Sequence, residues 1–220
     1  PYSLEYQVRG AWVFMANIRA VLFDLDGVLV DAPDWHYEAL NRALGLFGFT
    51  ITREEHDNYY NGLPTKRKLE KLTEDKGLSL SLHAFINEMK QVYTLECIHR
   101  DCHPEFGKQI MMKTLKKRGL HIAVCSNAIR KTIEVMLEHG MLLPYIDLIL
   151  SNQDVVKNKP DPEIYHTAMQ RLQVAPEETI IVEDSPHGVE AARASGAHVI
   201  VVRNATEVHL NIFTHHFPNL

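Results

Sequence analysis

The sequence predicts an α/β protein in which several strands form one parallel sheet and a group of helices is inserted after the first strand. Short apolar runs recur along the chain, and amphipathic helical patterns lie between them. One interval of roughly 90 residues after the first run carries helical signals but no strand. Strands that alternate with helices are typical of a parallel sheet.

The first apolar run, Ile18 to Phe23, is rich in β-branched and aromatic residues and predicts a buried strand. Later strands are predicted at residues 122–125, 146–150, 180–182 and 199–202. Helices with one apolar face are predicted between them, at residues 106–115 and 129–137. A third helix is predicted to begin at Asp161 as N-cap, with Pro162 at its first position.

The long interval predicts helices near residues 35–47, 66–72 and 82–95. Because it follows the first strand, these helices should lie over the carboxyl edge of the sheet, where open α/β sheets bind ligands. The predicted organisation is a core of residues 18–31 and 101–220, a helical cap domain of residues 32–100, and an N-terminal extension or added sequence in residues 1–17.

The amino-acid composition limits the kinds of molecule that the protein is expected to bind. The 220 residues carry a formal net charge of -5, so no basic field is available to attract nucleic acid or an anionic membrane. No stretch reaches the roughly 20 consecutive apolar residues of a membrane span. Three cysteines are too few for a disulfide framework. We therefore expect a cytoplasmic protein, a monomer or weak dimer, that acts on a small molecule rather than on nucleic acid or membrane.

Asp24 and Asp26 stand two positions apart where the first strand leaves the sheet through Gly27. A carboxylate can attack phosphorus, and a second one can protonate the leaving oxygen and later deprotonate water. The pair therefore predicts Asp24 as nucleophile and Asp26 as acid and base. The alternative is that both belong to an ordinary solvated turn.

Three further groups end the later strands or lie in loops at the same edge: Ser126-Asn127, Lys159-Pro160 and Glu183-Asp184. Each has a structural alternative. Ser126 and Asn127 are suited to cap the following helix, Lys159 has Lys157 as a rival, and Glu183-Asp184 could cap a helix. Two acids that end an apolar strand nevertheless need either solvent or a cation.

In this order the motifs resemble those of the haloacid dehalogenase superfamily, in its helical-cap branch. The stretches Val182 to Gly188 and Lys159 to Tyr165 resemble the fourth and third motifs of that family. The sequence is similar to β-phosphoglucomutase-like and phosphoglycolate phosphatase-like members. The resemblance implies a Rossmann-like doubly wound parallel sheet core with an inserted small α-helical cap domain.

The resemblance also implies Mg2+ as cofactor and a small phosphorylated metabolite as substrate. It assigns the metal to Asp24, the main-chain oxygen of Asp26 and Asp184, with Glu183 as an additional or supporting ligand. It assigns the phosphate-binding groups to Ser126, with Asn127 beside it, and Lys159. The expected reaction is hydrolysis of a phosphomonoester through an aspartyl-phosphate. A phosphohexomutase, a phosphonatase that uses Lys66 or Lys68 as its cap lysine, and a binding protein without turnover are the alternatives.

Substrate choice is expected to depend on the cap, where His36, Thr65 and Lys66 are the candidate contacts. Thr65 stands where the related mutases carry an arginine for a second phosphate, which argues against mutase activity. The alternative for residues 66–71 is the solvated face of a helix.

Overall fold

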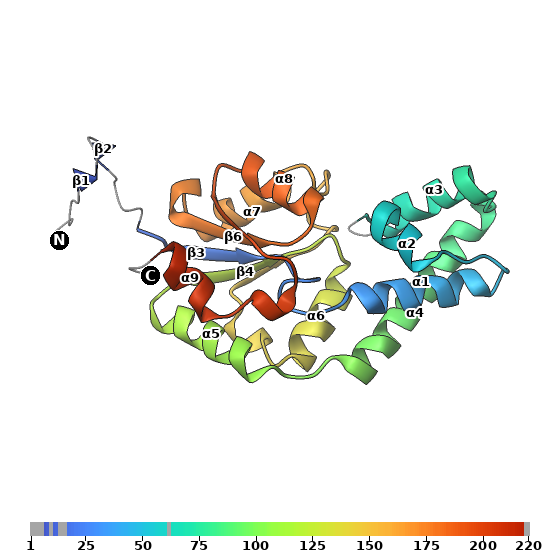
Figure 1. Ribbon diagram of the computed structural model, residues 1–220, viewed down its shortest axis with the longest axis horizontal. Coiled ribbons are helices and arrows are strands. Elements are labelled where there is room, and N and C mark those ends of the chain that lie inside the picture. The colour runs from blue at the N-terminus through green and yellow to red at the C-terminus, as the bar shows by residue number, and fades with distance from the viewer. Residues whose placement is uncertain (1–6, 9–10, 13–16, 61–62, 218–220) are drawn as a thin grey trace.

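A computed structural model describes residues 7–8, 11–12, 17–60 and 63–217 of the chain (Figure 1). Within these residues, five parallel strands form one sheet in the order β5-β4-β3-β6-β7. They are β3 (Ala20–Phe23), β4 (His121–Cys125), β5 (Leu148–Leu150), β6 (Thr179–Glu183) and β7 (His198–Val201). The predicted parallel sheet is confirmed. Most of the predicted N-terminal extension lies outside the described residues, and its described parts pair as the antiparallel strands β1 (Gln7–Val8) and β2 (Ala11–Trp12).

Helices cover both faces of the sheet (Figure 1). Val21 and Phe23 of the central strand β3 belong to the apolar cluster on one face, with α5 (Phe106–Lys117), α6 (Arg130–His139) and α9 (Leu210–His216). Ala20 and Leu22 belong to the cluster on the other face, with α7 (Glu163–Leu172) and α8 (Pro186–Ala194). Both faces of β3 are therefore buried, which explains its continuous apolar run. The doubly wound core is confirmed.

The start of α7 differs slightly from the prediction. The helix begins at Glu163 with Pro162 as its N-cap, one residue later than expected. The Asp161 carboxylate still accepts a hydrogen bond from the Glu163 N–H at 3.0 Å, so it satisfies a free donor of the first turn.

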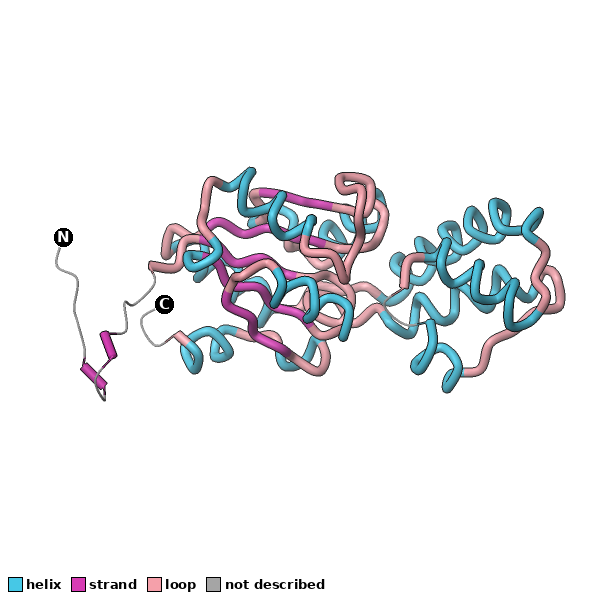
Figure 2. The backbone as a smooth tube through the Cα atoms, turned by 90° about the horizontal axis from the view of Figure 1, so that it is seen from above, coloured by secondary structure: helices cyan, strands magenta, loops and turns pink. Residues whose placement is uncertain are grey.

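The helices from α1 to α4, which come between β3 and α5 in the chain, form a separate group beside the carboxyl ends of the strands (Figure 2). Its α-helices are α1 (Pro33–Gly45), α2 (Arg53–Glu55), α3 (Thr65–Lys76) and α4 (His83–Asp101), and a π-helical turn follows α2. These elements share an apolar core of their own, which includes Leu40, Leu69 and Ile86. We call this group the cap. In the part of the chain that the structure describes, no helix is both long and apolar enough to cross a bilayer.

Candidate active site

The loop that follows β3 is folded tightly around the Leu25 carbonyl oxygen, which accepts hydrogen bonds from the N–H groups of Leu29 and Val30 at 2.9 and 3.0 Å. Gly27 has a φ of +84°, and a Cβ at this position would lie 2.1 Å from Asp184 Oδ2. Only glycine fits there without displacing a carboxylate. The loop therefore brings Asp24 and Asp26 to the same crevice as Asp184.

Lys159 lies at the centre of the polar network beneath this crevice. Its Nζ donates to Asp24 Oδ1 and Glu183 Oε1, both at 2.6 Å, and to the Cys125 carbonyl oxygen at 2.7 Å. Burial lowers the pKa of Lys159, but the carboxylates of Asp24 and Glu183 outweigh this and raise the pKa above its usual range. Lys159 therefore stays charged. Its rival Lys157 lies on the surface, with its Nζ 3.7 Å from Asp161.

Glu183 and Asp184 are adjacent in sequence but differ in environment. Glu183 is fully buried, and it accepts hydrogen bonds from Tyr165 Oη at 2.6 Å and from the Asp184 N–H at 3.0 Å, in addition to Lys159. Gly188 makes this close packing possible, because a Cβ there would lie 1.9 Å from Glu183 Oε1. Asp184 lines the crevice, and among the described residues its buried Oδ1 has no hydrogen-bond partner. Asp184 thus has an oxygen left for a ligand.

The carboxylates of Asp24, Glu183 and Asp184 form a group whose ligand atoms lie within 4.8 Å of one another. Burial raises the pKa of Asp24 well above its usual value; Lys159 opposes this, while Glu183 and Asp184 add to it. Burial and the charge of Glu183 raise the pKa of Asp184 to about 7. Such crowding of buried acids is relieved by a cation, and oxygen donors suit a hard divalent ion. The residues present therefore fit a divalent metal.

Ser126 and Asn127 follow β4 and line the crevice. Ser126 Oγ accepts a hydrogen bond from the Ala128 N–H at 3.0 Å, and it donates to no acceptor among the described residues, so its hydroxyl proton can be donated to a ligand. The Asn127 side chain accepts a hydrogen bond from the main-chain N–H of Lys159 at 3.3 Å. It also donates one to the main-chain carbonyl oxygen of Lys159 at 3.5 Å. Asn127 therefore orients the segment that carries Lys159, a role that its sequence position did not suggest.

The cap contributes His36, whose Nε2 lies 3.0 Å from Asp26 Oδ1. On the other side of the ring, Lys90 Nζ lies 3.3 Å from Nδ1. An ammonium group only donates, so Nδ1 accepts and the proton resides on Nε2, which donates to Asp26. Burial would raise the pKa of Asp26, but the electrostatic interaction and hydrogen bond with the polar His36 ring, followed by the charge of Lys90, lower it overall. His36, predicted as a substrate contact, lines the crevice and also orients Asp26.

Apart from Glu183, which is buried beneath it, these groups line one crevice of about 360 Å³ between the core and the cap. Thr65 and Lys66, at the start of α3, lie along it as the sequence predicted for substrate contacts. Sequence reasoning considered Lys68 of α3 only as a cap lysine for the phosphonatase alternative, and it missed the side chains of α4. The signal was present in α4, where the polar residues of the crevice recur at the spacing of one helix face, namely Asn87, Lys90, Gln91 and Thr94.

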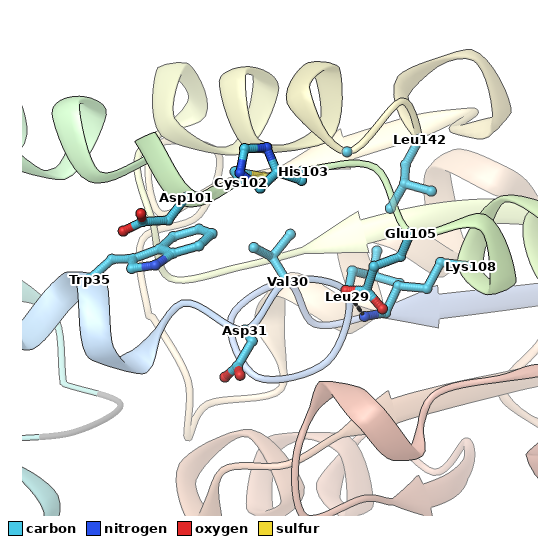
Figure 3. Close-up of a pocket in the computed structure, with 11 residues that line it drawn as sticks. Leu29, Val30, Asp31, Trp35, Asp101, Cys102, His103, Glu105, Lys108 and Leu142 are labelled. Atoms are coloured by element: carbon cyan, nitrogen blue, oxygen red, sulfur yellow. Dashed lines mark hydrogen bonds and ion pairs between the residues drawn. The ribbon is translucent and has the colours of Figure 1, made fainter. Parts of the chain in front are cut away.

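A second cavity of about 190 Å³ lies where two segments of chain connect the core to the cap (Figure 3). Its apolar lining includes Val30, Trp35 and Leu142, and Asp31 and Asp101 lie at its edge. It shares no lining residue with the crevice that holds Asp24, so the two cavities are distinct.

Comparison with known proteins identifies the family of the chain. Residues 21–202 match the model of the haloacid dehalogenase-like hydrolase family. A phosphorylated carbohydrates phosphatase from Thermotoga maritima is 30% identical over 182 residues, which cover 81% of this chain and 82% of that protein. A putative phosphatase of Bacillus subtilis, YhcW, is 26% identical over a match that covers 85% of this chain and 84% of that protein.

Among solved structures, CbbY from Rhodobacter sphaeroides in complex with phosphate superposes with a TM-score of 0.76 at 25% identity, over 84% of this chain and 85% of that one. The β-phosphoglucomutase of Clostridium difficile has a TM-score of 0.78 at 22% identity, over 91% of this chain and 97% of that one, and shows the shared fold. The named phosphatases support the predicted enzyme class, a phosphoric monoester hydrolase. The chain therefore belongs to the haloacid dehalogenase-like hydrolase family.

Proposed function

We propose that the chain is a Mg2+-dependent phosphatase that hydrolyses a small phosphorylated carbohydrate through an aspartyl-phosphate on Asp24. The observation that carries this proposal is the convergence of Asp24, Asp26, Lys159 and the unpartnered Oδ1 of Asp184 on one crevice. The Thermotoga relative named above supports the substrate class.

Asp24 and Asp184 would hold Mg2+ with side-chain oxygens, and Asp26 with its main-chain oxygen. Mg2+ prefers such oxygen ligands and keeps some of its waters. When bound, it supplies positive charge that reduces the repulsion between Asp24 and an anionic phosphoryl group. Glu183 supports the site indirectly, since its oxygens are occupied by Tyr165, Lys159 and the Asp184 N–H.

The protein groups divide the chemistry between them. An Asp24 oxygen attacks phosphorus and the bond from phosphorus to the leaving oxygen breaks. The protonated form of Asp26 gives its proton to that oxygen and is left as a carboxylate. Asp26 then takes a proton from the water that hydrolyses the aspartyl-phosphate. His36 holds the Asp26 carboxyl group in place throughout. Ser126 donates to a phosphoryl oxygen, and Lys159 supplies positive charge beside Asp24 that attracts the phosphoryl group, so much of the catalysis is positioning and charge stabilisation.

The test is phosphate release from a panel of sugar phosphates, nucleotides and p-nitrophenyl phosphate, with Mg2+ or with EDTA. Turnover should be abolished by EDTA and by Asp24→Asn. Asp31→Asn is the matched control, because Asp31 is exposed and lies at the other cavity. Full activity of Asp24→Asn would remove the proposed nucleophile. Interconversion of hexose 1-phosphates and 6-phosphates without net release would favour a mutase instead.

A further inference from the structure

Three polar side chains that line the crevice on its core side have no partner among the described residues. They are Thr132 of α6 and Asn152 and Asn158 of the loop between β5 and α7, and we call them the core polar group. The amide oxygens of both asparagines are shielded from solvent and lack a hydrogen-bond partner within this part of the chain. Thr132 is only 5% exposed, and its hydroxyl bonds to no described residue. Buried polar groups are normally paired, because leaving one unpaired costs free energy.

The loop that carries the two asparagines is held firmly by carboxylates. Asp154 accepts hydrogen bonds from the Ser151 N–H at 2.8 Å and from the Arg130 side chain at 2.9 Å. Glu163 accepts from the main-chain N–H groups of residues 156–157 at 2.8 and 2.9 Å. The unpaired amides therefore do not reflect a loosely packed loop. A fixed main chain instead positions them in advance for a ligand.

The asparagines lie beside the residues proposed to act on the phosphoryl group. Asn158 directly precedes Lys159 in the chain. The Asn152 main-chain N–H donates to the Ala128 carbonyl oxygen at 3.1 Å, and the Ala128 N–H donates to Ser126 Oγ at 3.0 Å. The core polar group would therefore meet the part of the substrate that is closest to the scissile ester.

The chemistry of the core polar group indicates the kind of ligand that it suits. An ionised phosphate only accepts hydrogen bonds, and so does an amide oxygen, so the phosphoryl group cannot pair with the oxygens of Asn152 and Asn158. Each of these oxygens needs a donor, while the amide NH2 groups and the Thr132 hydroxyl can themselves donate. The hydroxyl groups of a carbohydrate or polyol both donate and accept. They therefore complement all three side chains.

We propose that Thr132, Asn152 and Asn158 bind hydroxyl groups of the substrate and thereby select a leaving group with free hydroxyls close to the phosphate ester. The core then takes part in substrate choice, which the sequence led us to expect of the cap. This inference rests on the proposed function for the phosphoryl transfer, and it adds residues that recognise the carbohydrate. They contact the leaving group and none of the reacting atoms.

The test compares substrates of equal chain length that differ in their hydroxyl groups. Glycerol 3-phosphate is paired with propyl phosphate, and sorbitol 6-phosphate with hexyl phosphate. Phosphate release by the parent gives kcat/KM, and calorimetry on Asp24→Asn with Mg2+ gives Kd. The parent should prefer the hydroxylated member of at least one pair by about tenfold or more, because several hydrogen bonds form with that member alone.

Loss of any one member of the core polar group should reduce this preference. Thr132→Val, Asn152→Ala and Asn158→Ala should each lower the ratio of the two kcat/KM values in a pair by about threefold or more. Gln153→Ala is the control on the same loop and should keep the ratio, because Gln153 is exposed and lies outside the crevice lining. Thr132→Val should also leave the thermal midpoint of the ligand-free protein equal or higher, since the hydroxyl has no partner to lose.

Equal kcat/KM values within both pairs for the parent would overturn the inference. An equal loss for both members of a pair in all three variants would also overturn it, because the side chains would then act on the phosphoryl group or on the fold. If the folded parent releases phosphate from none of these substrates and from none of the earlier panel, the proposed function fails and the Kd values decide. A preference for the hydroxylated ligand that the variants lose would then support the inference, and equal Kd values would overturn it.

Discussion

His36 Nε2 lies 3.0 Å from Asp26 Oδ1, so a helix of the cap holds the proposed acid and base of the core. Lys90 sets the direction of this hydrogen bond by donating to the opposite ring nitrogen at 3.3 Å. Orientation of Asp26 thus depends on a contact that crosses from core to cap.

The first prediction follows from this contact. His36→Ala should lower kcat by about 10- to 100-fold, because Asp26 loses the donor that orients it. KM should change by less than about threefold if His36 acts mainly through Asp26. His36→Gln, which restores an N–H donor near the position of Nε2, should recover part of kcat. A rise in KM alone would show that His36 is chiefly a substrate contact.

Glu183 and Asp184 should respond differently to loss of charge. Asp184→Asn should weaken Mg2+ binding by at least about tenfold, yet raise the thermal midpoint of the metal-free protein, because one of three crowded acids is removed. Glu183→Gln should lower the midpoint, since Lys159 loses a buried partner. Calorimetric titration with Mg2+ and thermal unfolding in EDTA measure both effects. Loss of stability in Asp184→Asn would contradict the assignment of Asp184 as the free ligand.

Gly27→Ala should be damaging for two independent reasons. The φ of +84° disfavours alanine, and the added Cβ would collide with the Asp184 carboxylate. We expect a loss of at least about 2 kcal/mol in the free energy of unfolding, measured in urea, together with loss of activity. Gly107→Ala is the matched control, because Gly107 lies within helix α5 with open space around it. That substitution should be neutral or stabilising.

Lys68→Met should stabilise the protein. Burial and the repulsion from Lys90 lower the pKa of Lys68 to about 7, whereas an unfolded chain retains the lysine proton up to about pH 10.5. Between these two pH values, Lys68 in the folded protein binds fewer protons than Lys68 in the unfolded chain. Its unfavourable contribution to the free energy of unfolding is therefore largest at pH 7 and below and falls as the pH rises. We expect a gain of about 2 kcal/mol near pH 6.5 that declines towards pH 9.5, measured by urea denaturation.

The control for that prediction is Lys71→Met on the same helix, since Lys71 is paired with Asp75 at 3.0 Å. It should change stability by no more than about 0.5 kcal/mol at any of these pH values. A destabilised Lys68→Met protein would mean that Lys68 already has a stabilising partner. Lys90 and Asp26 are the charged groups that act on Lys68 in the native state, so their own variants should shift this pH dependence.

The core was predictable because its strands are buried on both faces and leave continuous apolar runs, as in β3 and β6. The acids at the strand ends could be found for the same reason, since each ends or follows such a run. Lys159 lies in a loop beyond β5 and was indicated instead by its adjacent proline and the family resemblance. The sequence could not separate Glu183 from Asp184. Their difference arises from Tyr165 and Gly188, which are distant from one another in the chain and meet only in the fold.

The cap was less predictable. A lysine-rich stretch in a helix usually indicates a solvated face, and this was the alternative interpretation of residues 66–71. Lys66 is indeed exposed, but Lys68 is buried against the crevice, because the next turn of α3 packs Leu69 and Leu72 into the cap. Which lysine faces inward depends on the rotation of α3 about its own axis, and the sequence period alone gives no reference for that rotation.

The residues that line the crevice are distributed unevenly along the chain, and this distribution affects how the protein could evolve. Every cap residue that lines it comes from one uninterrupted stretch of chain, residues 33–94, whereas the core residues are scattered from Asp24 to Ser185. A single recombination event within one gene segment could therefore replace the whole cap side of the crevice at once. The scattered core groups could be exchanged only by several coordinated changes, so the two halves of the crevice are free to evolve at different rates.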